Sequence, residues 1–230
     1  MTMTKLFSLF AATGIALSAS VAMAQDKSTA PKEAPKHAEG EHKHDKDCEH
    51  ASKQAELGAP APDFTLTDTD GKTVGLSDFK GKIVVLEWFN PECPVIVQHH
   101  KTNTTFNDLY TEYKSKDVVF LGINSSAPGK QGHGKELNAK MKTEYKIEYP
   151  ILLDESGDVG RLYAAKTTPH CYVIDKDGKL VYRGAIDDKK TGKPGSKNYV
   201  KAALDQVLRG ETVTENDTKP YGCSVKYSSK

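Results

Sequence analysis

The sequence has little of what nucleic-acid surfaces and disulfide-stapled mini-proteins need. Its 230 residues include only four cysteines, and 32 basic residues are balanced by 31 acidic ones, which leaves a formal net charge of +1. A chain without excess positive charge has no electrostatic footprint for nucleic acid or for an anionic membrane surface. Four irregularly spaced cysteines are too few for a disulfide framework. We therefore expect one conventional hydrophobic core and no nucleic-acid partner.

Long apolar runs are also missing after the N-terminus. Lys5 precedes an apolar run over residues 6–19, and the small residues Ala22 and Ala24 fit a signal-peptidase site. The run is short for a membrane span, which needs about 20 residues. We expect residues 1–24 to be a signal peptide cleaved after Ala24. The mature protein would then be periplasmic or secreted, with no stable membrane insertion.

Large apolar side chains are scarce in residues 25–57, which are rich in Lys, Glu, Ala and His. Such a composition cannot bury a core and predicts a disordered linker. The segment also holds imidazole and thiol groups, which are ligands for copper or zinc, although their spacing matches no closed zinc finger. We expect no required cofactor and at most weak copper or zinc binding here, with a solvated spacer as the alternative. The candidate ligands are His42, His44, Cys48 and His50.

Strand and helix patterns alternate from residue 58 to residue 213, which predicts one domain followed by a tail over residues 214–230. The order implies an α/β fold in which a central mixed β-sheet is sandwiched by helices, with a β-hairpin at its N-terminus. The predicted hairpin turns at Asp70-Gly71. Predicted buried strands cover residues 83–89 and 118–123, and predicted helices cover residues 94–113 and 199–208.

Cys93 lies directly after a predicted buried strand and directly before a predicted helix, which Pro94 would begin. Unpaired N–H groups and the positive dipole end at a helix start favour thiolate over thiol. This position therefore predicts a nucleophilic cysteine with a lowered pKa. The alternative is an inert buried cysteine. His99 and His100 follow on the same predicted helix, where we expect either surface side chains or a histidine that tunes the thiolate.

Four segments in fixed order carry a resemblance to the thioredoxin-like redoxins of the AhpC/TSA type. They are Gly-Ala-Pro-Ala-Pro-Asp-Phe at residues 58–64, Leu-Ser-Asp-Phe-Lys-Gly-Lys at 76–82, the segment 87–94 around Cys93, and Thr168-Pro169 followed by 172–178. The resemblance implies a thioredoxin-like fold in which Pro169 is cis and packs against the cysteine. It also implies a substrate-binding surface made by Thr168, Pro169, Trp88 and Pro94.

Two positions depart from the better-known branches of these redoxins. A thioredoxin would have its second cysteine at Ile96, and a peroxiredoxin would have threonine at Asn90. The chain therefore resembles a peroxiredoxin-like subgroup with a lone active-site cysteine. A second thiol would have to come from elsewhere, either Cys223 in the tail or, as a second choice, Cys171 two residues after Pro169.

Three functions remain open on the sequence. The first is an exported thiol-based oxidoreductase in which Cys93 attacks the disulfide of a protein dithiol/disulfide partner. The second is a peroxiredoxin-like peroxide reductase that passes through a sulfenic acid. The third is a copper- or zinc-binding module in which the redoxin domain is only a scaffold. We expect the first.

Overall fold

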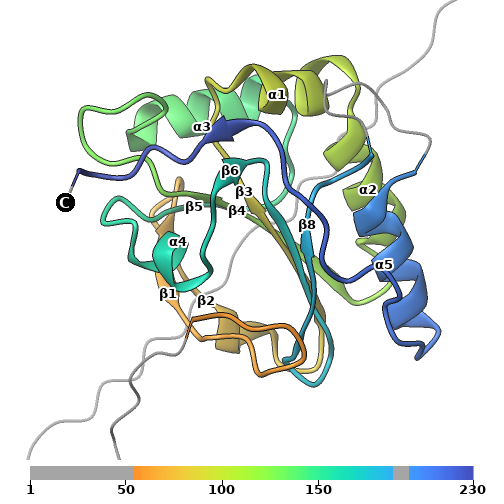
Figure 1. Ribbon diagram of the computed structural model, residues 1–230. Helices are drawn as coiled ribbons and strands as arrows, with labels where there is room; N and C mark the ends of the chain where they lie inside the picture. The colour runs from red at the N-terminus through yellow and green to blue at the C-terminus, as the bar shows by residue number, and fades with distance from the viewer. Residues whose placement is uncertain (1–53, 189–196, 230) are drawn as a thin grey trace, which may run out of the picture. The chain divides into compact units, whose positions relative to one another are not determined.

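The computed structural model describes residues 54–188 and 197–229, and these contain a seven-stranded mixed sheet (Figure 1). The strands are ordered β2-β1-β5-β4-β3-β7-β8. The central strand β3 pairs in parallel with β4 and antiparallel with β7. Strands β6 and β9 form a separate two-stranded sheet. The bounds are β1 (Thr65–Asp68), β2 (Thr73–Gly75), β3 (Ile83–Trp88), β4 (Val118–Asn124), β5 (Ile151–Leu153), β6 (Thr167–Thr168), β7 (Cys171–Ile174), β8 (Leu180–Gly184) and β9 (Cys223–Ser224).

The central strand β3 is buried along its whole length because the sheet is covered on both faces. Alternation sends Ile83 and Val85 to one core cluster, and Val84 and Leu86 to the other. This explains why the strand appears in the sequence as a continuous apolar run. The carboxyl end of β3 then delivers the chain to Cys93, which packs in the first cluster.

Helices cover both faces of the sheet, as the sequence predicts (Figure 1). Side chains of α1, α2 and α5 pack in the first cluster, and side chains of α4 and the β1–β2 hairpin pack in the second. The predicted hairpin is confirmed by antiparallel pairing of β1 with β2. The helical bounds are η1 (Leu76–Phe79), α1 (Pro94–Val97), η2 (Gln98–Thr102), α2 (Thr105–Tyr113), α3 (Lys135–Glu144), α4 (Asp158–Leu162) and α5 (Tyr199–Leu208).

The prediction of one helix over residues 94–113 is wrong. The chain runs as α1, continues as the π-helical turn η2, and restarts as α2 after a break at Thr104. Thr104 has φ 52°, in the left-handed region that β-branched residues rarely adopt. Its hydroxyl donates to Asp108 Oδ2 at 2.9 Å, and its carbonyl accepts from the backbone N–H of Asp108 at 2.8 Å. These contacts begin α2 in a new direction.

The ordered chain begins earlier than predicted. Ala55 is buried among the second core cluster, and its N–H donates to the carbonyl of Leu162 at 2.9 Å. Residues 54–57 therefore belong to the domain and not to the disordered linker. The predicted signal peptide and residues 25–53 of the predicted linker lie outside the described residues, and they stay predictions.

Within residues 54–188 and 197–229, no helix has the length and apolar character needed to cross a membrane.

Replacing Thr104 by asparagine should stabilise the fold. Asparagine tolerates the left-handed region better than a β-branched residue, so Thr104→Asn should raise the free energy of unfolding by about 1 kcal/mol. The matched control is Thr111→Asn, at an exposed position inside α2, which should change it by less than about 0.5 kcal/mol. Urea unfolding measures both. Equal effects of the two substitutions would show that Thr104 carries no backbone strain.

Candidate functional site

Cys93 is the residue that precedes α1, and its position follows from local backbone geometry. It has extended backbone angles, Pro94 occupies the first turn, and its carbonyl accepts from the N–H of Val97 at 2.9 Å. Proline suits this place because its missing N–H has no helical partner there and its φ is already helical. The Cys93 side chain is completely buried. A nucleophile in this position needs an opening before it can react with anything outside the protein.

A segment from the C-terminal tail covers Cys93. We call residues 220–227 the C-terminal strap. Its strand β9 pairs antiparallel with β6, with Cys223 opposite Thr168, and lies beside β6 (Figure 1). The Sγ atoms of Cys223 and Cys93 are 2.7 Å apart. A disulfide bond is about 2.05 Å long, so only a small movement separates these thiols from a bond.

The pKa values of the two thiols are shifted in opposite directions. Burial acts to raise the pKa of Cys93. Hydrogen bonds with the side chains of Cys223 and Thr168, and with the backbone N–H groups of Ile96 and Cys223, have a larger effect in the opposite direction. The net result is a lowered pKa. For Cys223, burial, the hydrogen bond with Cys93 and the negative charge of Cys93 raise the pKa to about 11. Cys93 is therefore the more acidic thiol of the pair, and its pKa shifts in the direction that its position before a helix predicted.

The peptide bond between Thr168 and Pro169 is cis, as the resemblance implied. The carbonyl of Thr168 lies 3.1 Å from Cys93 Sγ, and Thr168 itself is buried. Pro94 is exposed next to the cysteine. The assignment of Thr168, Pro169 and Pro94 to substrate binding stays a prediction, and the contact that Thr168 offers is its backbone.

Trp88 does not fit its predicted place on the substrate-binding surface. Its side chain is completely buried in the second core cluster, and its Nε1–H donates to Ser125 Oγ at 3.0 Å. The residue lies on β3, where alternation turns it to the face of the sheet opposite Cys93. The prediction was wrong because sequence proximity to the cysteine says nothing about the face of the sheet.

Cys171, the second choice as partner thiol, is completely buried on β7. Burial, together with the negative charges of Glu87 and Asp187, raises the pKa of its thiol well above the usual value. Its environment therefore disfavours the thiolate that exchange requires. The structure places Cys223, and not Cys171, at hydrogen-bonding distance from Cys93.

A buried polar cluster beneath the site escaped the sequence analysis. Glu87 on β3 accepts from Tyr149 at 2.8 Å and lies 2.7 Å from His100 Nε2, while the His100 ring stacks on Phe106. His100 is buried, so its interpretation as a surface residue is wrong. A sequence signal did exist, because Glu87 is the one charged residue in an otherwise apolar buried strand.

His99 holds the C-terminal strap to the helix that follows Cys93. Its Nε2 lies 2.9 Å from the hydroxyl of Tyr221, and that hydroxyl donates to Asp187 Oδ1 at 2.5 Å. Because the carboxylate can only accept, Tyr221 must receive its second hydrogen bond from the Nε2–H of His99. Burial lowers the pKa of His99, against the opposing charges of Asp187 and Glu87, and keeps the ring neutral.

The loop around Gly132 fixes the two residues that flank Pro91 just before the cysteine. Gly132 N–H donates to Glu92 Oε2 at 2.6 Å, and Asn90 Nδ2 donates to the carbonyl of Gln131 at 3.1 Å. A Cβ added at Gly132, which has φ +82°, would lie 2.2 Å from Asn90 Oδ1. Only glycine can bring this loop against the segment that positions Cys93.

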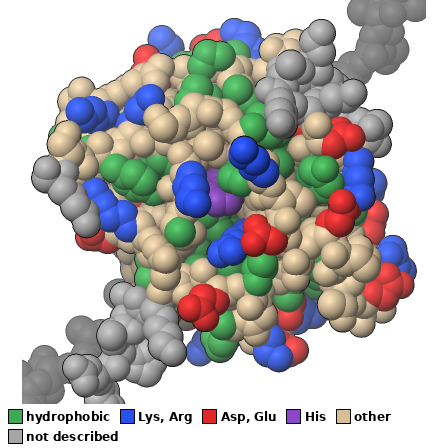
Figure 2. All heavy atoms as spheres, viewed as in Figure 1, with side chains coloured by type: hydrophobic (Ala, Val, Ile, Leu, Met, Phe, Trp, Pro, Cys, Tyr) green, Lys and Arg blue, Asp and Glu red, His purple; other side chains and the backbone are tan. Residues whose placement is uncertain are grey.

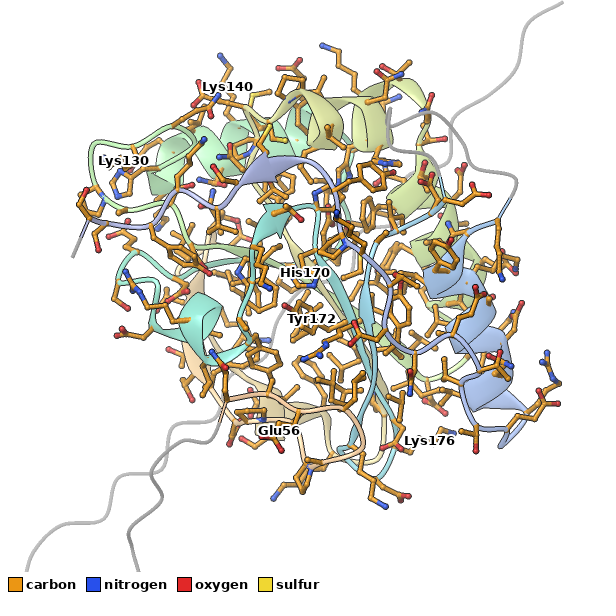
Figure 3. The ribbon with its side chains drawn as sticks, viewed as in Figure 1. Glu56, Lys130, Lys140, His170, Tyr172 and Lys176 are labelled. Atoms are coloured by element: carbon orange, nitrogen blue, oxygen red, sulfur yellow. The ribbon has the colours of Figure 1, made fainter. Side chains whose placement is uncertain are left out.

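His170 follows the cis-proline and is also buried, 4.5 Å from the ring of Tyr172 (Figure 3). Its Nδ1 is 2.8 Å from the Tyr172 hydroxyl. Burial, helped by the charges of Arg183 and Lys166 and opposed by Asp217, lowers the pKa of His170 to about 3. Figure 2 shows a small patch of histidine surface near the centre of this face, with Lys and Arg side chains beside it.

The candidate metal ligands of the histidine-rich leader, within residues 42–50, lie outside the described part of the chain. Among the residues that the structure describes, no group of three or more His, Cys, Asp or Glu side chains is arranged to hold a metal ion. Copper or zinc binding by His42, His44, Cys48 and His50 stays a prediction.

Residues 57–183 match the model of the AhpC/TSA family, which is more than half of the chain. The chain belongs to the AhpC/TSA family. This confirms the resemblance that the four sequence segments indicated, whereas the lone-cysteine subgroup stays a prediction. Within curated relatives, the chain is 31% identical over 129 residues to the thiol-disulfide oxidoreductase ResA of Bacillus thuringiensis subsp. konkukian, an alignment that covers 55% of this chain and 68% of ResA.

Solved structures show the same fold for this AhpC/TSA member. An uncharacterized conserved protein from Geobacillus kaustophilus superposes with a TM-score of 0.69 at 35% identity, covering 76% of this chain and 94% of that one. A chain from Chlorobium tepidum assigned as the thiol:disulfide interchange protein DsbE gives a TM-score of 0.52 at 25% identity, covering 68% and 98%. The thioredoxin-like fold is therefore confirmed.

The neutral state of His170 should make the fold sensitive to acid. Its folded pKa of about 3 lies below the unfolded value of about 6.5, so the unfolded chain binds more protons in this interval and stability falls as the pH falls through it. Between pH 7 and pH 4 this group should cost about 3 kcal/mol. His170→Gln should lose correspondingly less stability over that range, measured by urea unfolding at each pH.

The control for this prediction is His133→Gln, which removes a partly exposed histidine. Its acid-dependent loss should follow that of the native protein within about 0.5 kcal/mol. An unchanged loss in His170→Gln would mean that the ring is protonated in the fold.

Proposed function

We propose that the protein is a thiol–disulfide oxidoreductase in which Cys93 is the nucleophile and Cys223 the resolving thiol. The observation that carries this proposal is the 2.7 Å contact between the two sulfur atoms, with a lowered pKa on one and a raised pKa on the other. The similarity to ResA, whose name states this activity, supports it. The family resemblance alone would not choose between Cys223 and Cys171.

The first step is attack by the Cys93 thiolate on a partner disulfide. A bond forms between Cys93 Sγ and one partner sulfur, the partner disulfide breaks, and the second partner sulfur leaves as a thiolate that takes a proton from solvent. The lowered pKa of Cys93 favours the thiolate that makes this attack, and the backbone N–H of Ile96 stabilises its charge.

The second step follows from what raises the pKa of Cys223. Two of the raising causes, a hydrogen bond and a negative charge, come from Cys93 itself. Both disappear when Cys93 enters a mixed disulfide, while the lowering effect of Lys226, which lies on the same strap as Cys223, remains. Cys223 therefore ionises more easily when its thiolate is needed. Its attack on Cys93 forms the Cys93–Cys223 disulfide and releases the partner as a thiol.

The partner in this proposal is a protein dithiol or disulfide, and the reaction takes place outside the cytoplasm. The predicted signal peptide over residues 1–24 supports this location, since disulfides persist in exported compartments. The reduced Cys93–Cys223 pair would be regenerated by a thiol reductant.

Peroxide reduction is less well supported by the same site. The side chain of Asn90, at the position where the peroxiredoxin resemblance expects threonine, is already engaged: Nδ2 donates to Gln131 and Oδ1 accepts from Glu92 N–H. It has no hydroxyl to offer a peroxide. The adjacent Cys223 thiol instead suits disulfide exchange.

Replacing single cysteines separates the roles. With a disulfide substrate and a thiol reductant, Cys93→Ser should lower kcat/KM by at least about two orders of magnitude because the nucleophile is gone. Cys223→Ser should keep the first attack and accumulate a mixed disulfide on Cys93, visible by mass spectrometry. Cys171→Ala should stay within about threefold of the native rate, since this buried thiol takes no part.

The rate of hydrogen peroxide consumption distinguishes disulfide exchange from peroxidase activity. Stopped-flow consumption of hydrogen peroxide should proceed at the rate of an ordinary thiol. Rapid, Cys93-dependent peroxide consumption together with slow disulfide exchange would overturn the proposed function in favour of a peroxidase.

A further inference from the structure

The reactive sulfur is closed off by the chain itself. Cys93 is completely buried, and Cys223 in the C-terminal strap touches its sulfur. Any disulfide that Cys93 attacks must reach the place where the strap now lies. A reaction with a protein partner therefore requires that the strap move away from Cys93 and that a segment of the partner take its place.

Backbone contacts hold the middle of the strap in place. Cys223 pairs with Thr168 and Ser224 with Thr167, both antiparallel. The pairing continues where the N–H of Val225 donates to the carbonyl of Lys166 at 3.1 Å. Main-chain contacts of this kind form with any extended chain, which is how peptides add to the edge of a sheet. The β6 edge is thus a strand-addition site that the protein fills with its own tail.

One position in this pairing is selective. Gly222 has φ +125°, and a Cβ there would lie 2.1 Å from the carbonyl oxygen of Thr168. Backbone cannot move aside as a flexible side chain can, and L side chains rarely adopt this φ. In this register, the residue before the paired cysteine must be glycine.

Side chains fasten the strap on either side of this stretch. Tyr221 is bound through its hydroxyl to His99 and Asp187, and the Tyr227 hydroxyl donates to the carbonyl of Ala165 at 2.9 Å. These contacts bring the strap back to the same register after each departure. A partner segment has only the backbone pairing, so it is the weaker occupant once its own covalent bond to Cys93 is broken.

We propose that the protein works by strand exchange, in which an extended partner segment with a Gly-Cys pair takes the place of the strap on β6 and sets its cysteine opposite Thr168. This inference rests on the proposed thiol–disulfide function and names the partner's chemistry. The geometry that points to it is the Cys223–Thr168 register together with the close approach of Gly222 to Thr168.

The covalent steps balance within this exchange. With the strap displaced, the Cys93 thiolate attacks the partner's cysteine sulfur, and the other sulfur of that disulfide leaves as a thiolate and is protonated by solvent. The strap then returns, the Cys223 thiol gives its proton to solvent, and its thiolate attacks Cys93 Sγ. The partner's cysteine leaves as a thiolate and takes up a proton, so one disulfide is reduced as one is formed. Because strap and partner compete for one edge, resolution also expels the partner.

The test uses an eight-residue peptide with the sequence of residues 219–226, whose cysteine carries thionitrobenzoate as a mixed disulfide. Its twin has alanine in place of the glycine. With the full-length Cys48→Ser/Cys223→Ser variant, attack by Cys93 releases the coloured thiol and links the peptide to the protein. The glycine peptide should react about tenfold faster than the alanine peptide, because alanine in this register is strained and meets Thr168.

A second measurement loosens the strap. Gly222→Ala in the native chain should lift the strap and increase alkylation of Cys93 by iodoacetamide about tenfold. Lys219→Ala, an exposed residue just before the strap, is the matched control and should leave alkylation unchanged. Peptide mapping by mass spectrometry assigns the label to Cys93.

The outcomes distinguish this inference from the function on which it rests. If replacing Cys93 by serine in the Cys48→Ser/Cys223→Ser variant leaves the reaction with the small disulfide dithionitrobenzoate equally fast, Cys93 is no nucleophile and the proposed function fails. If Cys93 reacts with that small disulfide but treats the two peptides alike, or reacts with neither, strand exchange is overturned and the proposed function stands. The peptide comparison needs no change in the strap pairing residues other than Cys223→Ser, so it holds even if Gly222→Ala does not fold.

Discussion

The pairing of the tail with the short strand β6 is the constraint on which the site depends. Cys223 is 130 positions from Cys93 in sequence, and nothing in the local geometry of either residue would bring them together. Their contact exists because Thr168, beside the cis-proline, also carries the backbone edge on which β9 lies. The backbone of Thr168 therefore positions Cys223 beside Cys93, holds the strap over the site and sets the register of the strap.

Close packing around small residues makes this arrangement specific. Gly222 admits the strap at Thr168, and Gly160 does the same further along, where a Cβ would lie 2.4 Å from the Tyr227 hydroxyl. Hydrogen bonds then compensate for the burial of the thiolate, since burial alone would raise the pKa of Cys93. Reactivity and inaccessibility are thus combined in one side chain, and access is controlled by the strap rather than by the chemistry of the sulfur.

Local patterns made the position of Cys93 and the sheet predictable. A continuous apolar run ending at a cysteine and a proline indicates a buried strand and a helix start, and both are present at Cys93. Cys223 could be inferred because a tail cysteine has no core to fill. What could not be inferred depends on three-dimensional packing: the left-handed Thr104 has no sequence signature, and the face on which Trp88 lies follows from register.

Other misses have a related cause. His99 and His100 are adjacent in sequence, yet one holds Tyr221 of the strap and the other lies against Glu87 in the core. A helical pattern gives the spacing of such residues. It does not identify the residues from distant parts of the chain that will contact them. Glu87 was the usable clue, because a carboxylate in an apolar strand needs buried donors.

The distance along the chain between the two thiols has a thermodynamic consequence. Joining them encloses a loop of about 130 residues, and in the chain-entropy account a cross-link of that size restricts the unfolded ensemble by about 5 kcal/mol. The oxidised form should then resist heat and denaturant more than the reduced form. Linkage works in the opposite direction as well, since whatever holds the native fold together also protects the bond from reduction. Folding free energy and electron transfer are thus coupled. Turnover would alternate between a cross-linked, more stable oxidised form and a less stable reduced form.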